Sequence, residues 1–141
     1  MEQFVEFVTN HIILAGAFVA LSTLLFLDLF GAKLKGYPVV DPSGATQLIN
    51  REDAVVLDLR EGNEFHNGHI VNAVHVPLSS LKDRQSELEK YKSKPIIAVC
   101  RSGSRSGAAC SQLKKAGFEN IYNLKGGMMA WQHASLPIDK S

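Results

Sequence analysis

The chain has 141 residues, of which 45% are apolar and 21% charged, and its 15 Lys and Arg nearly balance its 14 Asp and Glu. This length is typical of one domain, and the composition excludes a disordered tail. The near-neutral charge argues against a nucleic-acid-binding protein, which usually carries a basic face. Two cysteines are too few for a disulfide framework.

The first 30 residues differ in composition from the rest of the chain. They hold five of the seven phenylalanines and carry charge only at Glu2, Glu6 and Asp28. Phe7 to Leu27 is an uncharged run of 21 residues. A helix of that length reaches about 30 Å, the thickness of a bilayer core. We therefore expect one transmembrane helix over about residues 7–27, within an N-terminal segment of residues 1–30; a core helix of a soluble domain is the alternative.

The charges on either side of this segment predict its orientation. A cleaved signal peptide starts with basic residues, whereas this chain starts with Glu2 and Glu6, so we expect a retained single-pass anchor. Lys33 and Lys35 follow the span, and lysines beside a span stay on the cytoplasmic side. The N-terminus should then lie outside and the following domain on the cytoplasmic side, at the inner membrane if the protein is bacterial. Residues 31–38, which contain two glycines and a proline, predict a short linker that breaks the helix.

From residue 39 to residue 139 the sequence alternates short apolar runs with helical patterns. Asp41 followed by Pro42 predicts a helix start, because aspartate caps a helix and proline suits its first position. Strands separated by helices imply right-handed crossovers and a parallel sheet. We therefore expect an α/β domain with a central parallel sheet flanked by helices. The expected strands are residues 54–59, 73–76, 95–99 and 121–122, and the later helices are residues 61–67, 79–91, 104–116 and 128–133.

The loop after the expected strand at residues 95–99 carries the strongest chemical signal. Ligands of open α/β sheets bind beyond the carboxyl ends of the strands. Cys100 lies at such an end, before a small-residue loop and a helix start. The backbone N–H groups of residues 101–105, the helix N-terminus and two arginine charges would all favour the thiolate. This pattern predicts Cys100 as a nucleophile, with an anion-binding cradle formed by Arg101, Ser102, Gly103, Ser104 and Arg105.

Other polar residues and the second cysteine are better explained by structure than by catalysis. Asp58 and Arg60 are strand neighbours on one face and predict a structural charge pair at the sheet edge. His66 and His69 have no evident third metal ligand, so we interpret them as structural. Cys110 follows two alanines, which favours a buried small side chain over a resolving thiol.

At this point the sequence resembles a known family, the single-domain rhodanese-like sulfurtransferases. The loop from Cys100 to Ser106 resembles the active-site loop of that family. Three further motifs agree in order and spacing, and the resemblance covers about residues 39–139. These motifs are Val56 to Arg60, Glu64 to Ile70 continued by Ala73 to Pro77, and Gly126 to Trp131.

The resemblance implies a sulfurtransferase that works through a persulfide on Cys100. The donor would be thiosulfate or a persulfide, the acceptor cyanide, a thiol or a protein cysteine, and no metal or organic cofactor would be needed. The related cysteine phosphatases use a Cys-x5-Arg loop, whereas Cys100 to Arg105 is Cys-x4-Arg and the phosphatase arginine position falls on Ser106. The shorter ring suits a sulfur atom better than a phosphate.

Two functions from different classes remain open at this stage. One is a membrane-anchored sulfurtransferase, whose partners would be a small sulfur donor, a thiol or protein acceptor and the lipid bilayer. The other is a non-catalytic interaction module with the same fold, which would dock a membrane-protein partner. The intact Cys-x4-Arg loop favours the enzyme, and the anchor favours the module, because transfer between small molecules needs no tether.

Overall fold

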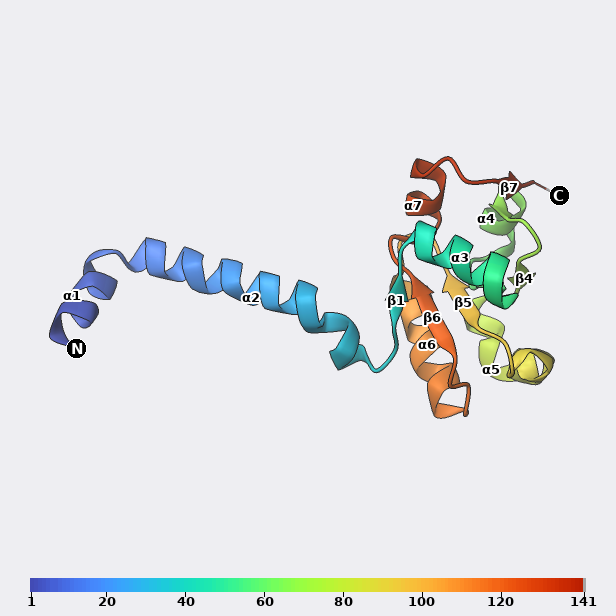
Figure 1. Cartoon of the computed structure of the whole chain (residues 1–141), viewed down its shortest axis with the longest axis horizontal. Coiled ribbons are helices and arrows are strands. Elements are labelled where there is room, and N and C mark those ends of the chain that lie inside the picture. The colour runs from blue at the N-terminus through green and yellow to red at the C-terminus, as the bar shows by residue number, and fades with distance from the viewer. Residues whose placement is uncertain (141) are drawn as a thin grey trace. The chain divides into compact units, whose positions relative to one another are not determined.

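A computed structural model of the chain describes residues 1–140 and all of their side chains except those of residues 32–34. The chain divides into an N-terminal unit, Met1–Lys35, and a second unit that begins at Gly36 (Figure 1). The side chain of Lys33, on which the expected orientation partly depends, lies outside the described residues.

The N-terminal unit consists of helix α1, Glu2–Asn10, and helix α2, Ile12–Lys35. The uncharged run from Phe7 does not form one helix, because His11 leaves helical geometry with φ −127° and ψ 44°. Polar residues of low helix propensity precede this break, and the Thr9 hydroxyl hydrogen-bonds back to the Val5 and Glu6 carbonyls at 3.0 Å. The stretch long and apolar enough to cross a membrane is therefore Ile12–Gly31, and none of it is buried within the protein.

The end of α2 also differs from the expected linker at residues 31–38. The helix continues through Gly31 to Lys35, and the chain turns at Gly36, whose φ is +76°. A single glycine inside a helix costs only about 1 kcal/mol relative to alanine. The left-handed conformation at Gly36, which glycine adopts without strain, is what ends the helix.

The second unit contains the expected parallel sheet, with strand order β1-β6-β5-β2-β4. Its central strands β2 and β5 are short apolar runs, because both of their faces are covered. Two-residue strands that we did not expect complete the structure: β1 at one edge of the sheet, and the separate antiparallel pair β3 and β7. The strands are β1 Val39–Val40, β2 Val55–Asp58, β3 His69–Ile70, β4 Val74–His75, β5 Ile96–Val99, β6 Ile121–Leu124 and β7 Ile138–Asp139.

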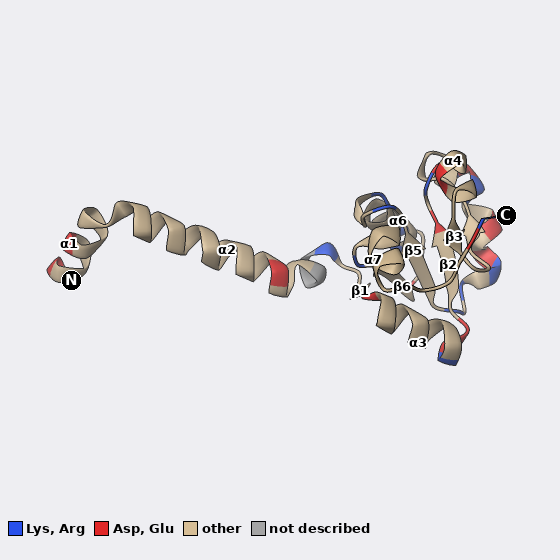
Figure 2. Ribbon diagram, turned by 90° about the horizontal axis from the view of Figure 1, so that it is seen from above, with Lys and Arg blue, Asp and Glu red and all other residues tan. Residues whose placement is uncertain are grey.

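Helices cover both faces of the sheet and divide the core into two clusters. Figure 2 shows α3, Pro42–Glu52, on one side of the strands and α6, Ser104–Lys115, on the other. Alternate residues of β5 enter opposite clusters: Ile96 packs with the α6 side, and Ile97 with α3 and with α7, Gly127–His133. Trp131 of α7 is a buried core residue.

Two helices that were expected from the sequence can be compared with the structure. The expected cap of α3 is confirmed, because the Asp41 carboxylate accepts a hydrogen bond from the Gly44 N–H at 2.7 Å. The expected single helix over residues 79–91 is wrong, although Leu81 and Leu88 of this segment are buried. Serines and an aspartate of low helix propensity leave this segment in short turns that bury the two leucines. These turns are η1 Leu78–Ser80, α5 Leu81–Arg84 and η2 Gln85–Tyr91. Helix α4, Gly62–His66, precedes them in the chain.

Candidate active site

Cys100 lies where the sequence predicts it, directly after β5 and four residues before α6 begins. Its side chain is buried within the loop, with 1% of the residue exposed. Gly103 caps α6 with a φ of +110°, a conformation that L side chains rarely adopt. The loop can therefore curl back over the sulfur before the helix starts.

Hydrogen-bond donors converge on the sulfur from this curled loop. The Gly103 N–H donates to Cys100 Sγ at 3.0 Å, and the Ser106 hydroxyl lies 3.3 Å from it. Burial raises the pKa of the Cys100 thiol, but hydrogen bonds from the Ser106 side chain and from the backbone N–H groups of Ser106, Gly103 and Ser102 outweigh it, so the pKa is lowered. The site thus favours the thiolate, the nucleophilic form of cysteine.

Asn123 on β6 contacts both Ser106 and Gly103, which donate to the sulfur. The sequence analysis did not identify this residue. Its Oδ1 lies 2.6 Å from the Ser106 hydroxyl, and its Nδ2 donates to the Gly103 carbonyl at 3.0 Å. The Ser106 hydroxyl carries one proton, so Asn123 Oδ1 at 2.6 Å and the sulfur at 3.3 Å compete for it, and a charge on the sulfur strengthens its claim. In the sequence Asn123 stands just beyond the expected strand at residues 121–122, and its burial is evident only from the structure.

Arg105, which the sequence predicts as part of the anion cradle, is paired with Glu64 of α4 in this structure. The Arg105 Nη1 and Nη2 donate to the two Glu64 carboxylate oxygens at 2.7 and 2.9 Å. The hydrogen bond with Arg105 is the main reason that the pKa of Glu64 falls from 4.5 to about 2, against the opposing effect of burial. Among the residues that the structure describes, the exposed Arg101 is then the cation of the loop whose side chain has no hydrogen-bond or ion-pair partner.

The remaining predicted loop residues contribute through the backbone more than through their side chains. The Ser102 N–H is one of the donors to the sulfur, whereas its side chain is exposed. Ser104 begins α6 and is also exposed. Of the expected N–H groups of residues 101–105, those of Ser102 and Gly103 donate to the sulfur, and the N–H of Ser106 adds a further donor.

The start of α7 fixes the other side of the loop. The N–H groups of Met128 and Met129 donate to the carbonyls of Cys100 and Arg101 at 2.8 and 3.2 Å. Gly127 allows this approach, because a Cβ there would lie 2.3 Å from the Cys100 carbonyl oxygen. The sequence showed the two-glycine motif, but not that its function is to hold the loop.

Asp58 and Arg60 form the buried charge pair that the sequence predicted. Arg60 Nη2 lies 2.8 Å from Asp58 Oδ2 and also donates to the Gly68 carbonyl at 2.7 Å. The pair follows β2, which neighbours β5, and it fixes the segment that carries Glu64. Nearby, the rings of His69 and His75 stack on Phe65 at 3.8 and 4.2 Å, which agrees with a structural role for His69.

A thiolate-favouring cysteine at the carboxyl end of a parallel sheet is the arrangement of proteins that use a cysteine nucleophile. The Rhodanese-like domain family matches residues 41–134. The chain belongs to this family of sulfurtransferases.

Individual relatives agree with this assignment. The uncharacterized protein YibN of Escherichia coli strain K12 is 37% identical over 139 residues, which cover 98% of this chain and 97% of the relative. The thiosulfate sulfurtransferase GlpE of Pseudoalteromonas translucida is 38% identical over 88 residues, covering 62% of this chain and 82% of the relative. A crystal structure of a rhodanese-related protein from Thermoplasma volcanium is 30% identical and superimposes with a TM-score of 0.68, covering 74% of this chain and 100% of that one.

Proposed function

We propose that the protein is a membrane-anchored sulfurtransferase that moves a sulfane sulfur through a persulfide on Cys100. The donor is thiosulfate or a persulfide, and the acceptor is a thiol or cyanide. The observation that carries the proposal is the set of donors on Cys100 Sγ, led by the Gly103 N–H at 3.0 Å. A buried cysteine without such donors would remain a thiol.

In the first half-reaction the Cys100 thiolate attacks the outer sulfur of thiosulfate. A bond forms between Sγ and that sulfur, the sulfur–sulfur bond of thiosulfate breaks, and its electron pair leaves with sulfite. We expect the Gly103 and Ser106 donors, which lie 3.0 and 3.3 Å from Cys100 Sγ, to help to stabilise the negative charge of the resulting persulfide. Arg101, exposed beside the nucleophile, attracts both the incoming donor and the departing sulfite.

In the second half-reaction an acceptor thiolate attacks the outer sulfur of the persulfide. The new bond joins the acceptor's sulfur to the outer sulfur of the persulfide. The bond between that outer sulfur and Cys100 Sγ breaks, and Cys100 returns to the thiolate. The same lowered pKa that makes Cys100 a nucleophile makes it a good leaving group here. No redox reagent is consumed, because the sulfane sulfur is transferred without a net change of electrons.

Two observations support the membrane anchor. The apolar part of α2 runs over the 20 residues of Ile12–Gly31, a length that suits a bilayer. The alignment with the Escherichia coli relative covers 98% of this chain and so includes most of the N-terminal unit. Lys33 and Lys35 follow the apolar stretch in the sequence, which supports a second unit on the cytoplasmic side, where a free catalytic thiol would stay reduced.

The experiment is intact mass spectrometry of the full chain in detergent after incubation with thiosulfate. We expect a gain of one sulfur atom that cyanide removes and that Cys100→Ser abolishes. Cys110→Ala is the matched control and should gain the same mass. Absence of any adduct with thiosulfate and with persulfide donors would refute sulfur transfer.

The exposed apolar helix α2 favours the second candidate, a docking module for a membrane-protein partner. This module would not need the thiolate, so Cys100→Ser would preserve the cellular phenotype. Loss of the phenotype in Cys100→Ser, with normal expression of the variant, would support the enzyme. A second unit released from α2 that restores the phenotype would argue against tethered docking.

A further inference from the structure

Helix α1 is separate from the apolar stretch of α2 that is long enough to cross a membrane. It ends at Asn10, His11 leaves helical geometry, and the apolar stretch begins at Ile12. Consecutive Cα atoms are about 3.8 Å apart, so the end of α1 lies within about 8 Å of the start of that stretch. Where Ile12 enters a bilayer, α1 must therefore lie close to the membrane surface.

The side chains of α1 divide into a polar and an apolar face. Each residue turns an α-helix by about 100°, so residues three or four apart share a face. Two carboxylates and an amide follow each other at intervals of four residues, and two phenylalanines and a valine occupy the opposite side. The polar face is Glu2, Glu6 and Asn10, and the apolar face is Phe4, Phe7 and Val8.

The apolar face of α1 is not covered by the protein. None of the nine residues of α1 is buried, and Phe4 and Phe7 are 69% and 58% exposed. Large apolar side chains gathered on one exposed face mark a contact with another protein or with a membrane. A surface outside this chain therefore covers the face.

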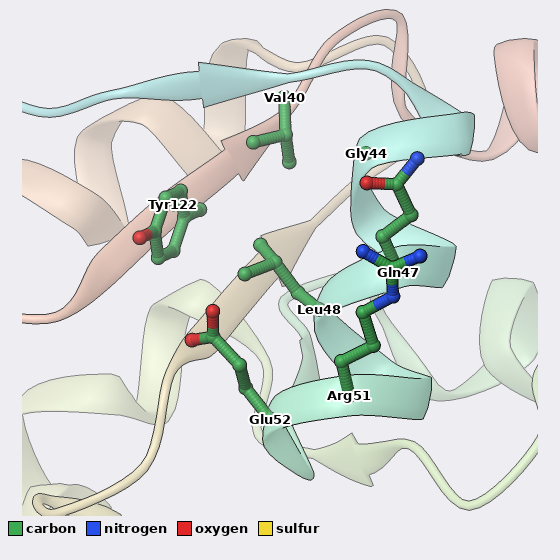
Figure 3. Close-up of a pocket in the computed structure, with 7 residues that line it drawn as sticks. All are labelled: Val40, Gly44, Gln47, Leu48, Arg51, Glu52 and Tyr122. Atoms are coloured by element: carbon green, nitrogen blue, oxygen red, sulfur yellow. The ribbon is translucent and has the colours of Figure 1, made fainter.

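Helix α3 shows a covered apolar face in the same chain. It has 11 residues, close to the nine of α1, and its Leu48 packs against the core. Figure 3 shows Leu48 on the side of α3 that faces Tyr122 of β6, whereas Gln47 and Arg51 lie along the helix and are exposed. Gln47 is therefore a control position on a helix side that faces water.

The charges of the N-terminal unit indicate which surface covers α1. Interfacial helices are usually rich in lysine and arginine, which attract anionic lipids. The polar face of α1 carries two glutamates instead, and the first Lys or Arg of the chain is Lys33. Anionic headgroups would repel this face, so the apolar side chains must supply the attraction. A lipid surface of low net charge meets both requirements and is reached by α1 as soon as Ile12 enters it.

We propose that α1 lies in the membrane interface, on the side of the membrane opposite to the second unit. The two phenylalanines and Val8 face the acyl chains, and the two glutamates face water. The break at His11 frees α1 from the axis of α2, so α1 can lie along the surface and fix the depth of the span. The proposal rests on the membrane anchor of the proposed function and adds a lipid contact that does not cross the bilayer.

The test places a tryptophan on each face of α1 in the full chain, reconstituted in phosphatidylcholine vesicles. The wild type supplies the background, because its one tryptophan, Trp131, is buried in the second unit. In Phe4→Trp the added emission should be quenched by lipids brominated in the upper part of the acyl chain, and not by iodide present on both sides of the membrane. In Glu6→Trp and in the control Gln47→Trp the added emission should be quenched by iodide.

The other outcomes separate the lipid interface from its alternatives. Equal quenching of Phe4→Trp and Glu6→Trp by lipids brominated deep in the acyl chain would overturn the proposal, because α1 would then be part of the span. Emission of Phe4→Trp that neither quencher reaches would overturn it as well, because a protein or a second copy of the chain would then cover the face. Quenching of Phe4→Trp by iodide alone would place the face in water and also overturn it.

Lipid charge and flotation complete the test. Lipid quenching of Phe4→Trp should not increase when phosphatidylglycerol replaces part of the phosphatidylcholine, because α1 has no Lys or Arg. An increase would overturn the inferred preference for a surface of low net charge. Failure of the wild type to float with the vesicles would instead overturn the membrane anchor itself.

Discussion

The two cysteines of this protein are both buried and lie ten residues apart, yet their surroundings have opposite effects. Cys100 lies in a loop whose N–H and hydroxyl groups point at its sulfur, and its pKa is lowered. Cys110 lies inside α6, where burial and then the nearby Cys100 charge raise the pKa of its thiol to about 12. Burial therefore raises the pKa of a thiol unless the backbone supplies hydrogen-bond donors to the sulfur.

The contact partners explain the difference between the two cysteines. The sulfur of Cys110 lies 3.6 Å from the Tyr122 carbonyl, an acceptor that stabilises the neutral thiol. The sulfur of Cys100 is instead close to hydrogen-bond donors. It lies between the end of β5 and the start of α6, where the first N–H groups of the helix have no partner within the helix. The strand–loop–helix junction thus lowers the pKa of one cysteine, whereas the helix interior raises the pKa of the other.

The largest expected effect comes from removing each sulfur in turn. Cys100→Ser should abolish both persulfide formation and alkylation by iodoacetamide, because the remaining thiol at Cys110 is protonated near neutral pH. Cys110→Ala should retain both reactions. Intact mass after each reagent measures this, and labelling at Cys110 in the Cys100→Ser variant would contradict the comparison.

A large effect is also expected where the loop meets α7. In Gly127→Ala the new Cβ would lie 2.3 Å from the Cys100 carbonyl oxygen, and the residue would have to keep a φ of +55°. The loop must shift, and a displacement of about 1 Å at a reacting group costs about a hundredfold in rate. Stopped-flow measurement of sulfur loading checks this prediction.

Gly62→Ala is the matched control for that substitution. A Cβ at Gly62 meets no atom within 4 Å, and its φ is not in the left-handed region. Loading should therefore keep its wild-type rate in Gly62→Ala. An equal fall in the loading rate of both variants would show that any added methyl group disturbs the protein. The close approach of Gly127 to the loop would then not be required for sulfur loading.

Local chemistry made Cys100 and its loop predictable from the sequence. An apolar run followed by a cysteine, a glycine and a helix start places the residue at the end of a parallel strand without any knowledge of distant contacts. The cap at Asp41 was predictable for the same reason, because its hydrogen bond spans three residues. The inward positions of Leu81 and Leu88 also follow from sequence spacing.

Features set by distant partners could not be predicted in this way. Arg105 was expected to bind an anion, but its partner Glu64 is 41 residues away in the sequence. The strands β1, β3 and β7 have two residues each, too few for a sequence period, and they exist through their pairing with other strands. Asn123 likewise acquires its role only when β6 comes to lie beside the loop.

Removing one donor from the active sulfur should shift its titration. Ser106→Ala deletes a hydroxyl that lies 3.3 Å from Cys100 Sγ and lowers the pKa of Cys100. The midpoint of the iodoacetamide rate against pH should move up by about one pH unit, the effect of one hydrogen bond to a charged group. Below both midpoints the rate should fall about tenfold, because it follows the thiolate fraction.

Ser111→Ala, on the same helix, controls for the loss of a hydroxyl elsewhere on α6 and should leave the profile in place. A profile for Ser106→Ala that coincides with the wild type would mean that the Ser106 hydroxyl donates to Asn123 in both protonation states. The backbone donors would then account for the whole difference between the two cysteines.

The smallest effect is expected from the ion pair that holds Arg105. Glu64→Gln should lower the free energy of unfolding by about 1 kcal/mol at neutral pH, since the pair is partly exposed. Binding lowers the pKa of Glu64 from 4.5 to about 2, so the ionised carboxylate stabilises the fold above pH 4.5 and loses that effect as the pH falls towards 2. Urea unfolding of both proteins should therefore converge at acid pH.

Glu87→Gln removes an equally well-formed but exposed pair with Arg84 and should leave stability unchanged. A stability difference for Glu64→Gln that is undiminished at pH 2 would show that packing around α4, and not the charge of Glu64, holds the arginine beside the Cys100 loop.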